Sequence, residues 1–379
     1  MFAFVITRLL TVMSIVKQIG TSIIVFCLAT CTTVADRSPE TNALLAALKS
    51  LSGQYILLGH QDATAYGVDW SAEPNKADVK STTGAYPAVY GWDVGHLEIG
   101  KPANLDNVSF NLMRTRIIEA YSRGGINTIS WHTTNPTNGQ SAWDTTRNSV
   151  KEILPGGKHH DTYNNYLSRL AAFFKTLKTD DGTAIPIIFR PFHEHTGSWF
   201  WWGEAFCSPQ EYVALWQYTV HYLRNKNGLK NLLFAYSSST IESEAHYLAR
   251  YPGDDYVDIM GFDDYCTGDE AAYVKRMANS LRVLTKVAKE RDKAAAVTET
   301  GYEQIPNANW FTQVLYPAIK DYPVVWILLW RNAINRPNHY YVPYPAHPAA
   351  DDFREFYRLP TICFEDGLAP FDIYQPTKP

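Results

Sequence analysis

The strongest constraint on the fold is an alternation of short apolar runs with helical segments that repeats eight times. The apolar runs cover residues 55–58, 87–93, 126–132, 185–190, 232–236, 257–261, 295–298 and 324–330. Apolar spacing predicts helices at residues 41–51, 105–123, 161–178, 209–225, 242–250, 269–291, 309–320 and 351–357. Continuous apolar runs of this length are typical of parallel strands that are covered on both faces.

Eight strand–helix units in about 300 residues predict an α/β fold, a single (β/α)8 TIM barrel with enlarged βα loops. A doubly wound sheet is the alternative, but it more often carries a Gly-rich nucleotide loop after its first strand. Gly59-His60-Gln61-Asp62 is not such a loop. The chain shows no internal linker, repeat or low-complexity tract, so we expect residues 41–379 to form one domain.

The amino-acid composition indicates which kinds of molecule the protein can bind. The net charge is −4, which gives no support to the basic face that nucleic-acid binding requires. Aromatic residues make up 14% of the chain, with 11 Trp and 24 Tyr. The excess fits either core packing or a surface that stacks on the flat apolar faces of sugar rings. Cys207, Cys266 and Cys363 are expected to be structural, with at most one disulfide.

The first thirty residues are expected to be a targeting segment. They contain Arg8 and Lys17 but no acid, and the apolar run 23–29 is shorter than the 20 or so residues that span a bilayer. This pattern is typical of a signal peptide. Leu28-Ala29-Thr30-Cys31 resembles the lipobox of bacterial lipoproteins, although Thr30 departs from the usual Gly, Ala or Ser.

The resemblance implies that Cys31 is lipidated, that residues 31–40 form a tether, and that the protein is anchored in the bacterial cell envelope, facing the periplasm or the cell surface. An ordinary signal peptide cut nearby, giving a secreted protein, and an uncleaved anchor are the alternatives. Met13 is a second candidate start, because the leader that follows it has more usual proportions.

Polar side chains follow nearly every predicted strand, and functional residues of TIM barrels gather at these strand ends. Glu194 comes directly after the fourth strand and Glu299 directly after the seventh. In an eight-stranded ring these positions face each other across the mouth. A lone glutamate there would usually be a solvated loop residue. Two facing carboxylates indicate a retaining glycosidase, in which one protonates the leaving oxygen and the other attacks the anomeric carbon.

Several motifs make the assignment more specific. Arg190-Pro191-Phe192-His193-Glu194-His195, followed by Trp199-Phe200-Trp201-Trp202-Gly203, resembles the acid/base block of glycoside hydrolase family 26. Gly59-His60-Gln61, Trp131-His132, Gly261-Phe262-Asp263-Asp264-Tyr265, Thr298-Glu299-Thr300-Gly301 and Trp330-Arg331 match that family in the same order. The resemblance runs from residue 41 onward. It implies a clan A TIM barrel and, for most members, β-mannanase activity.

The resemblance also implies roles for single residues. Glu194 corresponds to the acid/base and Glu299 to the nucleophile. Tyr265 resembles the tyrosine that hydrogen-bonds the nucleophile, Arg190 the arginine beneath it, and His193 stands where many clan members have asparagine. Since Glu194 must be protonated near neutral pH, we expect burial and the nearby Glu299 to raise its pKa.

Sugar contacts are expected from a further group of residues: His132, Trp143, Trp199, Asp263, Trp330 and Arg331. Trp330 resembles a platform beneath the reacting sugar, and Arg331 resembles a contact to the next sugar on the non-reducing side. Trp201 and Trp202 fit either platforms or packing. His60 and Asp93 are expected to be structural. His159, His160 and His347 lack an evident third ligand, so no metal site is predicted.

Together these features predict a monomeric endo-1,4-β-mannosidase that needs no cofactor and cleaves mannan, galactomannan or glucomannan by double displacement. Alternatives on the same scaffold are release of mannobiose from chain ends, and cleavage of xylan or of mixed-linkage β-glucan. A non-catalytic carbohydrate-binding lipoprotein and a metal-dependent polysaccharide deacetylase are alternatives of other classes.

Overall fold

The computed structural model describes residues 37–375. The predicted signal peptide, Cys31 and most of the predicted tether lie outside the described residues. Within the described part, no helix is both long enough and apolar enough to cross a membrane. The first helix, α2 (Pro39–Leu51), begins before the predicted position 41, because Ser38 caps it by accepting a hydrogen bond from the Thr41 amide.

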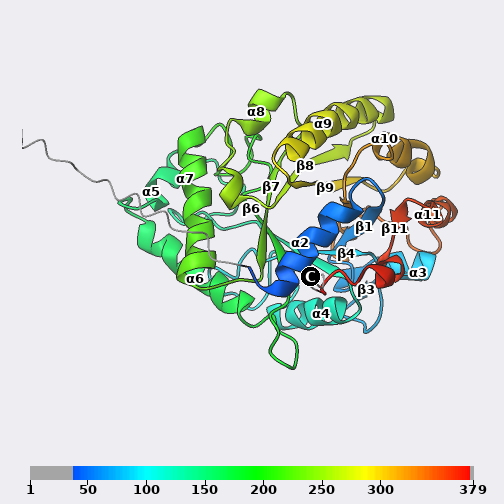
Figure 1. The fold of residues 1–379 in the computed structure, drawn as a ribbon, viewed down its shortest axis with the longest axis horizontal. Helices are drawn as coiled ribbons and strands as arrows, with labels where there is room; N and C mark the ends of the chain where they lie inside the picture. The colour runs from blue at the N-terminus through cyan, green and yellow to red at the C-terminus, as the bar shows by residue number, and fades with distance from the viewer. Residues whose placement is uncertain (1–36, 376–379) are drawn as a thin grey trace, which may run out of the picture. The chain divides into compact units, whose positions relative to one another are not determined.

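Eight parallel strands form the barrel (Figure 1). They are β1 (Ile56–Gln61), β4 (Val89–Asp93), β5 (Ile126–Trp131), β6 (Ile187–Pro191), β7 (Leu232–Ser238), β8 (Ile259–Cys266), β9 (Ala294–Tyr302) and β10 (Trp326–Leu329). Each pairs with the next, and β10 pairs with β1, which closes the ring. The predicted TIM barrel is therefore confirmed. A short strand, β11 (Ile362–Cys363), adds to β1 outside the ring.

Helices surround the ring. They are α3 (Asp78–Thr83), α4 (Phe110–Ser122), α5 (Ser149–Ile153), α6 (His160–Phe174), α7 (Pro209–Val220), α8 (Glu244–Leu248), α9 (Glu270–Glu290), α10 (Tyr316–Ile319) and α11 (Ala350–Tyr357). A hairpin of β2 (Tyr66–Gly67) and β3 (Trp70–Ser71) follows β1. These two short strands, α3, α5 and β11 were not predicted, because segments this short carry little periodicity.

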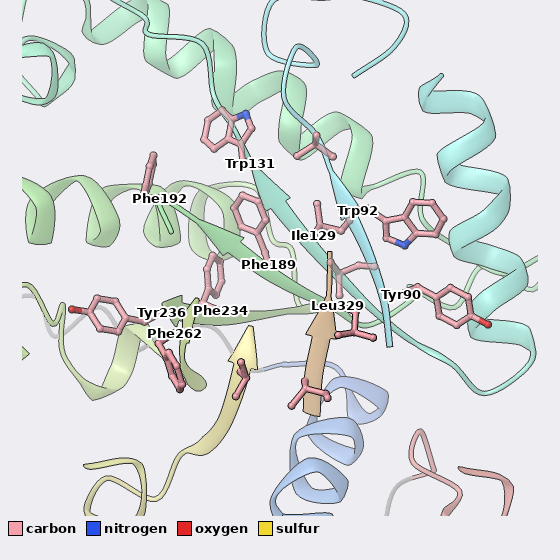
Figure 2. Close-up of a cluster of buried hydrophobic side chains, with 14 of the residues drawn as sticks. Tyr90, Trp92, Ile129, Trp131, Phe189, Phe192, Phe234, Tyr236, Phe262 and Leu329 are labelled. Atoms are coloured by element: carbon pink, nitrogen blue, oxygen red, sulfur yellow. The ribbon is translucent and has the colours of Figure 1, made fainter. Parts of the chain in front are cut away.

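Two cores follow from the alternation of side chains along each strand. One lines the barrel interior and continues onto Leu44, Leu48 and Leu51, so that α2 covers the N-terminal end of the barrel. The other fills the space between the strands and the outer helices (Figure 2), where Tyr90, Trp92, Trp131, Phe189, Phe234, Tyr236 and Phe262 gather. Functional residues can therefore lie at the C-terminal end of the barrel.

Most of the aromatic excess packs the core. Seven tryptophans are fully buried: Trp92, Trp131, Trp201, Trp202, Trp216, Trp310 and Trp326. Trp143 and Trp199 are the exposed ones within the described residues. The packing interpretation therefore holds for the bulk of these residues, Trp201 and Trp202 included, and the sugar-stacking interpretation can apply only to a few.

Two predicted helices contain π-helical turns that apolar spacing did not indicate. The predicted 209–225 helix is α7 followed by a π segment, His221–Lys226. The predicted 309–320 helix is a π segment, Phe311–Leu315, followed by α10. Pro317 lies in the first turn of α10, where its missing N–H is tolerated. Wider turns of this kind keep a near-helical apolar pattern, so the sequence does not distinguish them.

Strands β8 and β9 run further than predicted. Their pairing continues to Cys266 opposite Tyr302, past the end of the apolar runs at residues 261 and 298. Polar residues expected in loops therefore belong to the ladder. Glu299 and Tyr265 stand on hydrogen-bonded strands, which hold their side chains more firmly than a loop would.

Candidate active site

Glu194 and Glu299 meet at the C-terminal mouth of the barrel, as predicted. One carboxylate oxygen from each, together with one from Asp263, lies within 4.8 Å of the others. Retaining glycosidases hold their two carboxyl groups about 5–5.5 Å apart, whereas inverting enzymes leave about 6.5–9.5 Å for a water molecule. The short separation therefore favours the retaining geometry.

Glu299 is held by two donors. The Arg190 guanidinium forms an ion pair with Oε1 of Glu299, and the Tyr265 hydroxyl donates to Oε2 at 2.6 Å. Burial, and then the charge of Glu299, raise the pKa of Tyr265 well above its usual value, so the phenol keeps its proton. Both partners are hydrogen-bond donors, and together they fix the position of the Glu299 carboxyl group.

Glu194 has a different environment. It lies in the turn after β6 with φ of 51°, and Phe192 in the same turn has φ of 50°. Left-handed backbone is costly for residues with a side chain and often marks functional sites. Burial, with a further contribution from the charge of Glu299, raises the pKa of Glu194 to about 7. The Trp199 indole donates to Oε2 of Glu194 at 2.7 Å. The predicted rise in the pKa of the acid is thus present.

Asp263 was expected to contact substrate. Its side chain instead has no exposed surface and accepts a hydrogen bond from Arg190 at 2.9 Å and another from Thr298 at 2.6 Å. The reason is a β-bulge: Phe262 pairs with Val297 and Asp263 with Glu299, which leaves Thr298 as an extra residue on β9. The bulge turns the Asp263 carboxylate beneath Arg190, where it positions the arginine.

Three acids this close could in principle hold a cation, yet Arg190 contacts two of them and supplies the positive charge. The other candidate ligands lie elsewhere. His160 bonds the Ile153 carbonyl and the Tyr218 hydroxyl, and His347 bonds the Gln304 carbonyl. Among the described residues neither belongs to a group of three possible ligands.

Two histidines connect the turn that holds Glu194 to β4. His132 Nδ1 lies 2.8 Å from the Asp93 carboxylate, and His132 Nε2 lies 3.2 Å from His193 Nε2. Burial acts to lower the pKa of His132, but the Asp93 carboxylate outweighs it and the pKa is raised. Burial, then the charge of Arg190, hold the pKa of His193 well below its usual value. The two rings therefore form a continuous chain of polar contacts from Asp93 to His193, the residue before Glu194.

The predicted sugar-contact residues lie around the two carboxylates. Trp143 is 50% exposed and stacks on His132, with ring centroids 5.1 Å apart. Trp199 is 41% exposed. The Trp330 ring lies 6.5 Å from that of His132. Exposed indoles at the barrel mouth offer flat apolar surfaces on which sugar rings stack.

Arg331 has partners that the sequence did not suggest. Its guanidinium forms an ion pair with Asp106 at 2.8 Å and lies 3.4 Å from the Tyr66 hydroxyl. Tyr66 in turn donates to Asp62 at 2.5 Å. Asp106 stands in the loop after β4 and Tyr66 on the short strand β2 after β1, neither within a local motif, so only the fold brings them to Arg331.

The carboxylate pair and the barrel agree with known proteins. A model described as Glycosyl hydrolase family 26 matches residues 34–341. The chain belongs to this family. The predicted family resemblance is therefore confirmed over most of the chain.

Known proteins resemble this chain to different extents. It is 41% identical over 276 residues to a mannan endo-1,4-beta-mannosidase of Bifidobacterium adolescentis, covering 70% of this chain and 27% of that protein. It is 29% identical over 309 residues to a mannan endo-1,4-beta-mannosidase of Bacillus subtilis, covering 77% of this chain and 80% of that protein. The structure of a GH26 beta-mannanase from Bacteroides ovatus matches with a TM-score of 0.88 and 44% identity, over 90% of this chain and 99% of that one. The chain thus spans about a quarter of the Bifidobacterium protein.

Proposed function

We propose that the protein is a retaining endo-β-1,4-mannanase that acts on mannan, galactomannan or glucomannan. The observation that carries the proposal is a pair of close carboxylates in opposite environments, one tied to Arg190 and Tyr265 and one with a pKa of about 7. The relatives named mannan endo-1,4-beta-mannosidase support mannan as the substrate class.

The first step forms a covalent intermediate. A Glu299 oxygen attacks the anomeric carbon while the bond to the leaving oxygen breaks, and Glu194 transfers its proton to that oxygen. Tyr265 and Arg190 hold the Glu299 carboxylate in place before the attack. The product is a glycosyl ester of Glu299 and a shortened saccharide.

The second step releases the enzyme. Glu194, now ionised, takes a proton from a water molecule that attacks the anomeric carbon, and the Glu299 carboxylate leaves. Two displacements at one carbon restore the original anomeric configuration. A pKa of about 7 lets Glu194 act as acid first and as base second near neutral pH.

A product profile tests the substrate assignment. We expect release of reducing sugar from linear mannan, galactomannan and glucomannan, and initial formation of the β-anomer by NMR. Preferential release of mannobiose from chain ends, or cleavage of xylan or lichenan in place of mannan, would contradict the endo-mannanase proposal. Retention of mannan without cleavage would instead indicate a binding protein, and release of acetate that a chelator abolishes would indicate a metal-dependent deacetylase.

We also propose that the protein is a lipid-anchored enzyme of the bacterial cell envelope. The lipobox-like Leu28-Ala29-Thr30-Cys31, which follows a short apolar run, supports this location. A lipidated cysteine carries the two or more chains that stable membrane attachment needs. The native protein should fractionate with membranes, and Cys31→Ala should release it or block its processing. An unmodified N-terminus downstream of residue 31, found by mass spectrometry, would contradict the proposal.

A further inference from the structure

A groove of about 740 Å³ opens beside Trp199, outside the carboxylate pair. Its walls come from the loops after β6 and β7 and from α9, and include Trp199, Thr240, Glu242, Lys275, Arg276 and Asn279. Binding sites for small ligands commonly measure about 300–1,000 Å³, so the groove is large enough for an oligosaccharide segment.

The groove is joined to the chemistry at two points. Trp199 lines it and also donates to the acid/base, Glu194. Arg276 lines it and also donates to the Tyr265 carbonyl and to Asp264, both at 3.0 Å. The groove therefore adjoins the carboxylate pair through side chains that belong to both.

Its position in the ring indicates which end of a sugar chain it faces. Glu194 follows β6 and Glu299 stands on β9, so β7 and β8 lie on one side of the pair and β10, β1, β4 and β5 on the other. Arg331 and its partners Tyr66, on the short strand β2, and Asp106 lie in the connections on the second side. The groove belongs to the first side, next to the residue that protonates the leaving oxygen.

The chemistry of the lining suits a neutral sugar. Trp199 offers an exposed ring face at one end. Within residues 37–375, the side chains of Thr240, Glu242 and Lys275 make no hydrogen bond or ion pair. A hydroxyl, a carboxylate and an ammonium group along one wall can donate to and accept from sugar hydroxyls without imposing a net charge.

We propose that this groove binds the leaving-group end of the mannan chain, beyond the first sugar past the cleavage point, and that Glu242 and Lys275 contact it. The inference rests on the proposed mannanase function. It predicts that kcat/KM rises with the number of sugars on the leaving side, because only a longer leaving portion reaches Glu242 and Lys275.

The test compares Glu242→Ala/Lys275→Ala with the wild-type enzyme and with Lys289→Ala/Glu290→Ala. The control pair removes one positive and one negative charge, as the groove pair does. It lies outside the groove, in the last turn of α9, the helix that carries Lys275. Each protein is assayed on mannohexaose, with ¹⁸O-water to locate the cleaved bond, and on an aryl β-mannobioside. The groove variant should lose about 10-fold in kcat/KM on mannohexaose and shift its cleavage toward the reducing end. It should keep its activity on the aryl substrate, whose leaving group is a single ring, and the control should match wild type on both.

Three results would overturn the inference. One is a groove variant that cleaves mannohexaose like wild type, and another is an equal loss on the aryl substrate, which would indicate damage to the catalytic residues. The third is a loss confined to galactomannan, with linear mannan unaffected, which would assign the groove to a galactose branch. If the wild-type enzyme cleaves neither test substrate, the proposed function itself fails and the groove proposal falls with it.

Discussion

The two carboxylates that we propose to be catalytic, Glu194 and Glu299, stand on opposite sides of one barrel mouth in different surroundings. Glu299 lies on a long strand, with Arg190 and Tyr265 on its two oxygens. Glu194 lies in a turn with left-handed backbone and has one donor, Trp199. Identical side chains thus acquire different roles because one is surrounded by donors that stabilise charge and the other by burial and a neighbouring negative charge.

Removing the better-supported carboxylate should have the largest effect. Glu299→Ala deletes the nucleophile, and we expect kcat on mannan to fall on the order of 10⁴-fold or more. Reducing-sugar assays measure the loss, and circular dichroism checks that the variant is folded. Glu290→Ala, on an exposed part of α9, is a control that should stay active. A Glu299→Ala variant that keeps more than a few per cent of wild-type activity would contradict the assignment of Glu299 as the nucleophile.

Removing the other carboxylate should give a different defect. In Glu194→Ala the nucleophile remains, so an aryl β-mannobioside with a good leaving group should still form the glycosyl ester, while mannan cleavage falls about 10²–10⁴-fold. Azide, which needs no general base, should restore turnover and give a β-glycosyl azide. An α-glycosyl azide would mean that the two roles are exchanged.

The contribution of the donors to Glu299 can be measured separately. Tyr265→Phe removes one hydrogen bond to a charged group, worth about 1.5–3 kcal/mol. We expect kcat to fall by about 10- to 100-fold, partly through slower breakdown of the glycosyl ester, with little change in thermal stability. Full activity would make Tyr265 a packing residue.

The pH profile reports on Glu194. Its pKa of about 7 in the free enzyme places the alkaline limb of kcat/KM near neutral pH, because the acid is lost as pH rises. The Trp199 hydrogen bond lowers that pKa, so Trp199→Phe should move the limb to higher pH. Trp143→Phe changes the other exposed indole, which makes no hydrogen bond to Glu194, and should leave the limb in place. A limb that moves in the Trp143 variant, or in neither, contradicts this account.

The smallest expected effect is on stability. A carboxyl whose pKa is raised on folding costs stability once pH exceeds its unfolded pKa, and the cost is complete above the folded pKa of about 7. Glu194→Gln removes the charge and should raise the melting temperature by a few degrees at pH 8. Near pH 4 the difference should vanish, since both states of the wild-type protein then hold the proton. A Glu194→Gln variant that is less stable than wild type at pH 8 would show that the Glu194 charge does not destabilise the folded protein.

Most of the arrangement of strands could be predicted, because covered parallel strands leave continuous apolar runs. The same signal placed the ends of β8 and β9 too early, since their last residues are polar but remain paired. The role of Asp263 was missed because a bulge at Thr298 decides where that carboxylate points, and no residue type in the sequence predicts this bulge. Asp106 and Tyr66 were missed because Arg331 meets them only after the chain has closed into a ring.

The sequence by itself determined the barrel, the pair Glu194 and Glu299, and the family motifs around them, because strand periodicity and residue type are local properties. Only the tertiary structure decided that Arg190 compensates two of three neighbouring acids, that the pKa of Glu194 is about 7, and that a groove continues from Trp199 along α9. These depend on distances and burial between segments far apart in the chain, and electrostatic interaction is set by those distances rather than by residue identity.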